Sequence, residues 1–187
     1  MSRVNRRRFL KSTSTLAAGA GLGYLSSRSL GRSQSVNERP CFALIGCGGQ
    51  GTGDARRALA FGDMAVACDV DSAHSAYVQD IFTKRLGREG KKANIETCED
   101  YRAVIDRDDI DAIICGTVDH WHVKIAAEAL KSGKDVYCEK PLTLTVDEGR
   151  IISKVVEETG QLLQVGTQQR SDERFLKAVA IAQSGRL

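Results

Sequence analysis

The stretch that decides the fold runs from Pro40 to Leu59 and reads PCFALIGCGGQGTGDARRAL. Its apolar run, Phe42 to Ile45, has the length of a buried strand. After Gly51 the apolar residues recur at helical spacing, with Ala55, Ala58 and Leu59 on one side. The segment therefore predicts a strand, a glycine turn and a helix.

The turn spells Gly-x-Gly-x-x-Gly from Gly46 to Gly51. Gly46 permits a tight turn, Gly48 lets backbone amides approach a ligand closely, and Gly51 lets the helix pack against the strand. The amino end of the helix adds the positive end of its dipole, which favours a diphosphate. We therefore predict that this turn, including Gly49 and Gln50, binds the diphosphate of a dinucleotide.

The next strand candidate, Met64 to Cys68, is followed by Asp69. This acid lies about 18 residues past Gly51, close to the roughly 20 at which a carboxylate accepts both ribose hydroxyls. Such a carboxylate would repel the 2'-phosphate of NADP, so the sequence favours NAD. The alternative is that Asp69 only caps the helix that begins near Asp71.

The net charge of +3 is unevenly distributed. Residues 1–39 hold eight basic side chains and one acidic, so the remainder carries a net charge of −4. A mildly acidic folded region argues against a nucleic-acid partner. The six cysteines include no Cys-x-x-Cys pair, and most fall in or beside apolar strand candidates, which predicts buried thiols and no zinc site.

The basic segment Arg6-Arg7-Arg8-Phe9-Leu10-Lys11 resembles a twin-arginine export signal. The uncharged residues 12–27 that follow are too few and too weakly apolar for a membrane span. We expect export to the periplasm by the twin-arginine translocase. If the signal is not used, the protein stays in the cytoplasm. A disordered basic tail is the alternative.

Strand and helix candidates alternate along the rest of the chain. Further strands are predicted at 95–98, 110–115, 135–138 and 161–165, and helices at 71–86, 100–106, 120–132, 145–159 and 175–183. This alternation predicts an α/β fold with a doubly wound parallel sheet of the Rossmann type. Ligands bind beyond the carboxyl ends of such strands, which gathers the turn, Asp69 and the segments at 117–122, 139–141 and 166–170 into one crevice.

These motifs, in this order, resemble the Gfo/Idh/MocA oxidoreductases, which include glucose-fructose oxidoreductase and inositol dehydrogenase. The likeness covers residues 40–187, and Glu139-Lys140-Pro141 is its most discriminating part. The resemblance implies that Lys140 is catalytic, hydrogen-bonding the substrate hydroxyl and favouring the developing alkoxide. A solvated loop charge is the alternative.

The resemblance also implies further cofactor contacts, from Thr117, His120, His122, Glu139 and Arg170. Where the family usually has Thr-Pro, this chain has Thr117-Val118, which leaves the conformation of that loop open. Spaced i and i+2, the two histidines cannot share a helix face, so we expect no metal there. One of them can equally cap or pack.

In the family, a larger domain built on an open antiparallel sheet follows the dinucleotide domain. We therefore expect a signal and linker at 1–39, the NAD-binding Rossmann domain at 40–170, and at 171–187 the start of a truncated α+β substrate domain. The expected reaction moves hydride between NAD and a secondary hydroxyl of a sugar or cyclitol. Because the resemblance places the general base in the missing domain, this chain alone should bind NAD with little turnover.

Two other functions stay open. The chain can be a non-catalytic dinucleotide module that docks a partner, or a second copy in a homo-oligomer, through the helix at 171–184. A methyltransferase using S-adenosylmethionine would share the glycine turn and the ribose acid. It would not explain Glu139-Lys140-Pro141 or the His120 loop.

Overall fold

The computed structural model describes residues 39–91 and 94–185. The segment predicted to be an export signal lies outside the described residues. The described part contains a six-stranded, wholly parallel sheet with the strand order β3-β2-β1-β4-β5-β6. The strands are β1 (Cys41–Ile45), β2 (Asp63–Cys68), β3 (Glu96–Cys98), β4 (Ala112–Cys115), β5 (Asp135–Glu139) and β6 (Leu163–Gly166). This confirms the predicted doubly wound sheet, whose direction of winding reverses between β1 and β4.

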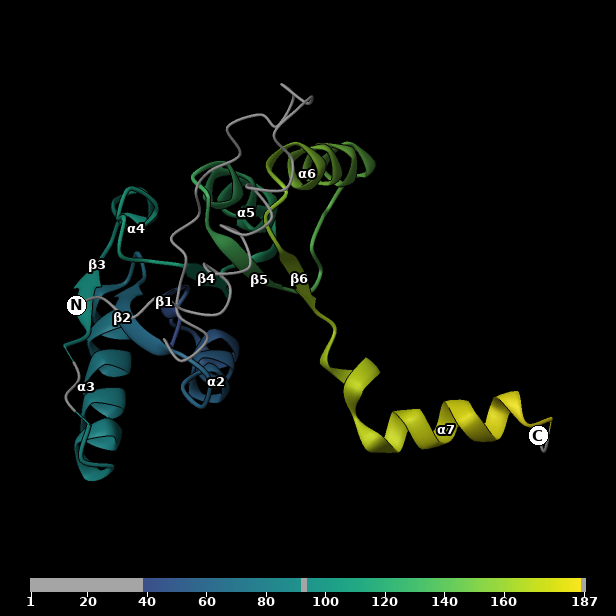
Figure 1. Cartoon of the computed structure of the whole chain (residues 1–187), viewed down its shortest axis with the longest axis horizontal. Helices are drawn as coiled ribbons and strands as arrows, with labels where there is room; N and C mark the ends of the chain where they lie inside the picture. Colours follow the sequence, from purple (N-terminus) through teal and green to yellow (C-terminus); the bar gives the residue numbers. More distant parts are fainter. Residues whose placement is uncertain (1–38, 92–93, 186–187) are drawn as a thin grey trace, which may run out of the picture.

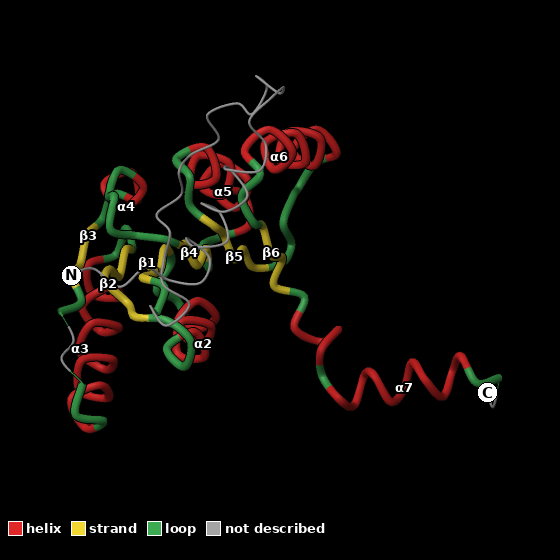
Figure 2. The backbone as a smooth tube through the Cα atoms, in the orientation of Figure 1, coloured by secondary structure: helices red, strands yellow, loops and turns green. Residues whose placement is uncertain are grey.

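Helices connect the strands, as the alternation predicts (Figures 1 and 2). They are α2 (Gly49–Ala58), α3 (Ser72–Arg88), α4 (Tyr101–Ile105), α5 (His122–Lys131), α6 (Val146–Thr159) and α7 (Glu173–Gln183). Two short 3-10 helices, η1 (Asp119–Trp121) and η2 (Gln168–Ser171), precede α5 and α7. The helix expected from His120 therefore begins at His122, because the preceding residues form the tighter turn of η1.

Alternation along β1 builds two hydrophobic cores. Ala43 and Ile45 belong to the core that α4, α5 and α6 cover, whereas Phe42 and Leu44 belong to the core under α2 and α3. Successive strand residues point to opposite faces, so a strand covered on both sides must be apolar throughout. This explains why the run before the glycine turn contains no polar residue.

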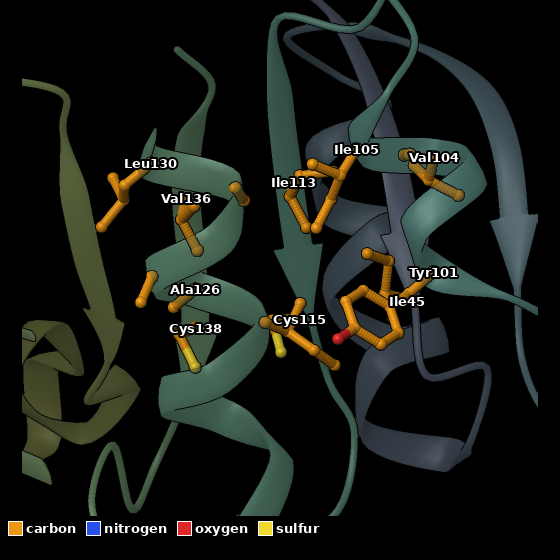
Figure 3. Packing of buried hydrophobic residues seen from close by; sticks show 14 of the residues in the cluster. Ile45, Tyr101, Val104, Ile105, Ile113, Cys115, Ala126, Leu130, Val136 and Cys138 are labelled. Atoms are coloured by element: carbon orange, nitrogen blue, oxygen red, sulfur yellow. The ribbon is translucent and has the colours of Figure 1, made fainter. Parts of the chain in front are cut away.

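Figure 3 shows part of the first core, where Ala126 and Leu130 of α5 lie over Val136 and Cys138 of β5. Cys47, Cys68, Cys115 and Cys138 are buried, as predicted for thiols that act as small apolar residues. All six cysteines lie in the described part and are free.

Helix ends follow local sequence signals. The side chain of Thr145 accepts the Glu148 N–H and the Glu148 side chain accepts the Thr145 N–H, which forms a capping box at the start of α6. That helix ends at Thr159, and its C-cap, Gly160, has a left-handed φ of 67°.

Helix α7 projects away from the sheet in Figure 1 and contacts η2. Phe175, Leu176 and Val179 are 45%, 54% and 52% exposed, so these apolar side chains of the helix are uncovered in the described structure. Within the described ranges, no helix has the length and apolarity needed to cross a membrane.

Candidate dinucleotide site

A cleft of about 750 Å³ opens at the carboxyl ends of β1, β2, β3 and β4. This is the edge of the sheet at which the sequence predicts a ligand. Of the predicted site residues, Gly46, Gly48, Asp69 and Thr117 line the cleft.

The glycine turn forms the floor of the cleft. Gly46 has a φ of +94°, and a Cβ built there would lie 2.5 Å from the carbonyl carbon of Gly116. A Cβ on Gly51 would overlap the carbonyl oxygen of Gly46, so α2 can pack this closely only if residue 51 is glycine. The tight turn and the close helix packing expected of these glycines are both confirmed.

Gly48 differs from its two neighbours in the motif. A Cβ built on it meets no described atom within 4 Å, and its φ of −67° is one that any residue adopts. Neither fold nor backbone strain therefore requires glycine at this position. Gly48 is also one of the residues that line the cleft.

The amino end of α2 lies at the same place. Among the described helices, α3, α4, α6 and α7 each begin with a side chain that accepts a backbone N–H, from Asp71, Asp100, Thr145 and Asp172 respectively. Helix α2, whose N-cap is Gly48, has neither a side-chain cap nor an acidic residue in its first turn; α5 shares this but follows directly on η1. Its first N–H groups and dipole thus suit an anionic ligand, and a dinucleotide's diphosphate fits them.

Asp69 stands at the end of β2 beside this turn, with its side chain 12% exposed. One carboxylate oxygen accepts the Cys47 N–H (2.6 Å) and the other accepts the Asp71 N–H (2.9 Å). The cap of α3 is Asp71 itself, whose side chain accepts the Ala73 N–H, so Asp69 is not the capping residue. Each oxygen of Asp69 retains a second lone pair for a ligand hydroxyl.

The thiol of Cys47 lies within the turn. Burial raises the pKa of the Cys47 thiol to about 12, and the charge of Asp69 contributes to the same direction. The thiol is therefore neutral at physiological pH and brings no negative charge to a site for a diphosphate.

The cleft has a second wall that the sequence analysis missed. Residues 99–102, after β3, line it together with His74 of α3. Tyr101 makes an edge-on ring contact with Trp121, at 5.9 Å between centroids, and its hydroxyl donates to Glu128 (2.8 Å). The strand predicted at 95–98 was the available signal, because its carboxyl end belongs at the same edge of the sheet as Asp69.

Thr117 and Val118 line the cleft after β4, and Val118 is 58% exposed. His122 is 1% exposed, with Nε2 3.1 Å from the Thr117 carbonyl and Nδ1 2.7 Å from the Pro141 carbonyl. It joins the loops after β4 and β5, which favours the packing alternative for this histidine. His120 is exposed beside Trp121, and its contact with a cofactor stays a prediction.

The residues after β5 form a separate group. Glu139 is 3% exposed and accepts hydrogen bonds from the Gln168 amide (2.6 Å), the Tyr137 hydroxyl (3.1 Å) and the Lys140 N–H (3.2 Å). Lys140 precedes a cis peptide bond to Pro141, and its side chain is exposed.

Other predicted contacts lie on exposed residues. Gly49, Gln50 and Arg170 are exposed, the last on η2, and none of these lines the cleft. Like Glu139 and Lys140, they stay predictions as site residues. Within the described part, no cluster of His, Cys, Asp and Glu is arranged to hold a metal ion.

Residues 41–167 match the model of a family described as an oxidoreductase family with an NAD-binding Rossmann fold. The chain belongs to the Gfo/Idh/MocA oxidoreductases. It is similar to a glycosyl hydrolase family 109 protein of Shewanella pealeana, with 28% identity over 84% of this chain and 38% of that protein. The inositol 2-dehydrogenase of Rubrobacter xylanophilus is 31% identical over 80% of this chain and 41% of the relative.

A solved family structure, the myo-inositol 2-dehydrogenase of Lactobacillus plantarum, matches with a TM-score of 0.66 and 27% identity. The match covers 80% of this chain and 42% of that one. The chain thus spans about two fifths of the length of the relatives it matches, namely the NAD-binding portion of this oxidoreductase family.

Proposed function

We propose that the protein transfers hydride between NAD and a secondary hydroxyl of a sugar or cyclitol, the described region supplying the NAD site. One observation carries the cofactor part of this proposal. The uncapped amino end of α2 opens onto the cleft at Gly48, with the Asp69 carboxylate beside it. NAD, when bound, would accept or supply the hydride.

In this proposal backbone amides at the amino end of α2 donate to the diphosphate, where Gly48 lines the cleft. Asp69 accepts the two ribose hydroxyls and discriminates against a 2'-phosphate by charge repulsion. Thr117 borders the cofactor from the loop after β4. The named activity of the inositol 2-dehydrogenase relative supports a cyclitol or sugar as substrate.

Lys140 is the residue proposed to act on the substrate. Its ammonium would donate to the reacting hydroxyl and stabilise the negative charge that develops on oxygen as hydride leaves carbon. The backbone N–H of Lys140 is held by the buried Glu139, so the residue is fixed at its root while its side chain is exposed.

Trp121 gives a direct test, because it is the single tryptophan of the chain and lines the cleft. We expect NAD to change its fluorescence in a saturable way, and NADP to bind more weakly. Lys140→Met should leave NAD affinity unchanged and abolish NADH formation from any sugar or cyclitol that the protein oxidises. Failure of NAD to bind, or equal affinity for NADP, would contradict the proposal.

A second candidate is hydrolysis of a glycosidic bond, favoured by the similarity to the Shewanella pealeana protein named as a glycosyl hydrolase. Release of nitrophenol from nitrophenyl glycosides, compared with NADH formation from free sugars and cyclitols, separates the two activities. A requirement for NAD in the release of nitrophenol would support a shared cofactor site.

We also propose export through the twin-arginine translocase, on the sequence Arg6-Arg7-Arg8-Phe9-Leu10-Lys11. Replacing the three arginines by lysine should retain the protein in the cytoplasm of the producing cell, as measured by fractionation.

Self-association in a homo-oligomer is proposed as well, and a solution mass that rises with concentration would support it.

A further inference from the structure

A buried histidine lies between the loop after β4, which borders the cleft, and the loop after β5, which carries Lys140. His122 is 1% exposed and is the first residue of α5. Its Nδ1 lies 2.7 Å from the carbonyl oxygen of Pro141, and its Nε2 lies 3.1 Å from the carbonyl oxygen of Thr117. One imidazole ring therefore contacts the backbone of both loops.

The fold places this ring for simple reasons. Ile125 and Ala126, three and four residues after His122, are buried in the first core, so all three residues lie on the same side of α5. Strands β4 and β5 are paired neighbours under this helix. The first turn of α5 thus comes to lie where the two strands end.

The two partners of the ring have the same hydrogen-bonding chemistry. A backbone carbonyl oxygen only accepts hydrogen bonds, so each ring nitrogen must carry a hydrogen for both contacts to be hydrogen bonds. A neutral imidazole carries hydrogen on one nitrogen only, and its other nitrogen would face a carbonyl oxygen with a lone pair. The geometry at His122 therefore fits the doubly protonated ring.

Two effects oppose a charge at this position. Burial disfavours a cation, and so does the positive end of the α5 dipole, because His122 is in the first turn. Two hydrogen bonds from a charged donor to carbonyl oxygens favour the cation, and such bonds are roughly twice as strong as neutral ones. The two short contacts decide in favour of the charged ring, since the neutral ring loses one of them.

The contact with Pro141 also bears on Lys140. The buried Glu139 side chain accepts the Lys140 N–H (3.2 Å), and His122 lies at the carbonyl oxygen of the next residue (2.7 Å). Buried polar side chains therefore hold the backbone on both sides of Lys140, whose own side chain is exposed.

We propose that His122 is a positioning residue whose ring carries hydrogen on both nitrogens and donates one hydrogen bond to each loop. This fixes the backbone of Lys140 relative to Thr117, which lines the cleft. Loss of the second ring hydrogen to solvent at high pH would release one loop. The double protonation is independent of the proposed function, whereas its effect on a bound cofactor rests on that function.

A thiol faces the ring from the sheet. Cys115 of β4 is buried, its Sγ lies 3.6 Å from the Thr117 hydroxyl, and a charge on Cys115 or His122 would act on the other. Cys138, its partner in register, lies in the same core, whereas Glu139 alternates to the opposite face of β5. Charged side chains on η1, α5 and α6 are exposed or paired with one another, namely Asp119, His120, Lys124 with Glu128, Arg150 with Asp147, and Lys154 with Glu158.

The test uses the full chain with nitrogen-15 in its histidines and three variants. The sequence contains three histidines, so the ring signals lost in a His122 variant identify that residue. His122→Gln keeps an amide donor for one carbonyl, and His122→Leu keeps an apolar side chain without a donor. Lys124→Gln is the matched control, since Lys124 is exposed on the same helix and paired with Glu128.

At neutral pH we expect one histidine with two slowly exchanging ring N–H groups in the wild type and in Lys124→Gln, and its loss in both His122 variants. Hydrogen exchange, followed by mass spectrometry, should be roughly tenfold faster at the Lys140 amide in His122→Leu and less affected in His122→Gln. Exchange within β1 should stay unchanged. NAD should shift the ring signals of His122, because Thr117 lines the cleft.

A His122 ring with hydrogen on only one nitrogen would overturn the proposal. Exchange that rises equally throughout the sheet in His122→Leu would also overturn it, since that result indicates a general packing role. If NAD does not bind, the proposed function fails, while the spectra of the free protein still decide the protonation.

A failure of both His122 variants to fold leaves two other measurements. His74→Gln and His120→Gln then assign the remaining ring signals by elimination. Exchange of the Lys140 amide in the wild type, corrected for its intrinsic pH dependence, should increase once the ring loses its second hydrogen at high pH. An unchanged rate across that pH step would overturn the positioning role.

Discussion

Substituting Gly48 by alanine separates the requirements of the fold from those of the cofactor. The new methyl group would meet no described atom within 4 Å, and the φ of −67° is allowed for alanine. We therefore expect the free energy of unfolding to change by less than about 0.5 kcal/mol, as for a strain-free surface substitution. The methyl group would instead occupy space in the cleft that we assign to the diphosphate.

Overpacking a contact of this kind costs about 1–3 kcal/mol, so NAD affinity should fall roughly 5- to 150-fold. Two matched variants calibrate the measurement. Gly51→Ala places Cβ onto the Gly46 carbonyl oxygen and should lower the melting temperature strongly. Gly53→Ala, in the same helix, meets only Arg57 Nη1 at 3.9 Å, and should raise stability by up to about 1 kcal/mol with NAD affinity unchanged.

Calorimetric titration with NAD and thermal unfolding of the same samples are the two assays. If Gly48→Ala binds NAD as tightly as the wild type, the diphosphate does not lie against this part of the turn. If Gly48→Ala loses stability as Gly51→Ala does, the space beside Gly48 serves the fold rather than a ligand. Either result refutes the reasoning.

Three further predictions concern Gly166, Asp69 and Asp54. Gly166→Ala forces Cβ onto the Glu139 carboxylate and should destabilise the protein by about 1–3 kcal/mol in urea unfolding. Asp69→Ala should weaken NAD binding by roughly tenfold or more. It should also reduce the ratio of NAD affinity to NADP affinity, as measured by parallel titrations with the two cofactors. The pKa of Asp54 is raised in the folded state, so the unfolded chain loses this proton first as pH rises. The free energy of unfolding should therefore fall as pH rises from the unfolded to the folded pKa of Asp54. Unfolding curves of Asp54→Asn taken across pH should lack that fall.

Much of the architecture could be predicted because local signals and tertiary packing agree. The apolar run before Gly46 became β1, buried on both faces, and the helix predicted at 145–159 became α6 with a capping box at Thr145. Segment boundaries were less exact where 3-10 turns replace α-helix, as at Asp119–Trp121. A period of 3.6 residues does not distinguish the first turn of a helix from a 3-10 turn that precedes it.

The candidate site was predicted in part. Gly48 and Asp69 could be placed because motif spacing fixes them relative to β1 and β2, and both line the cleft. The wall at 99–102 was missed, since it depends on β3 pairing with β2, and a strand of three residues carries little signal in the sequence. The burial of Asp54 was missed because nothing local in the sequence shows that this side of α2 is covered.

The sequence itself marks Asp54 as an unusual residue. It follows Gly51 and precedes Ala55 on the side of α2 that packs on the sheet, so an amphipathic helix places a charge where only apolar or small residues are expected. A buried acid at such a position needs either a cation or a proton. Asp54 has a cation within reach, since Arg57 contacts it at 3.0 Å while its own side chain stays largely exposed to water. Asp54 interrupts the apolar side of α2, where it does not help to stabilise the helix. The residue is therefore retained for the groups that it contacts.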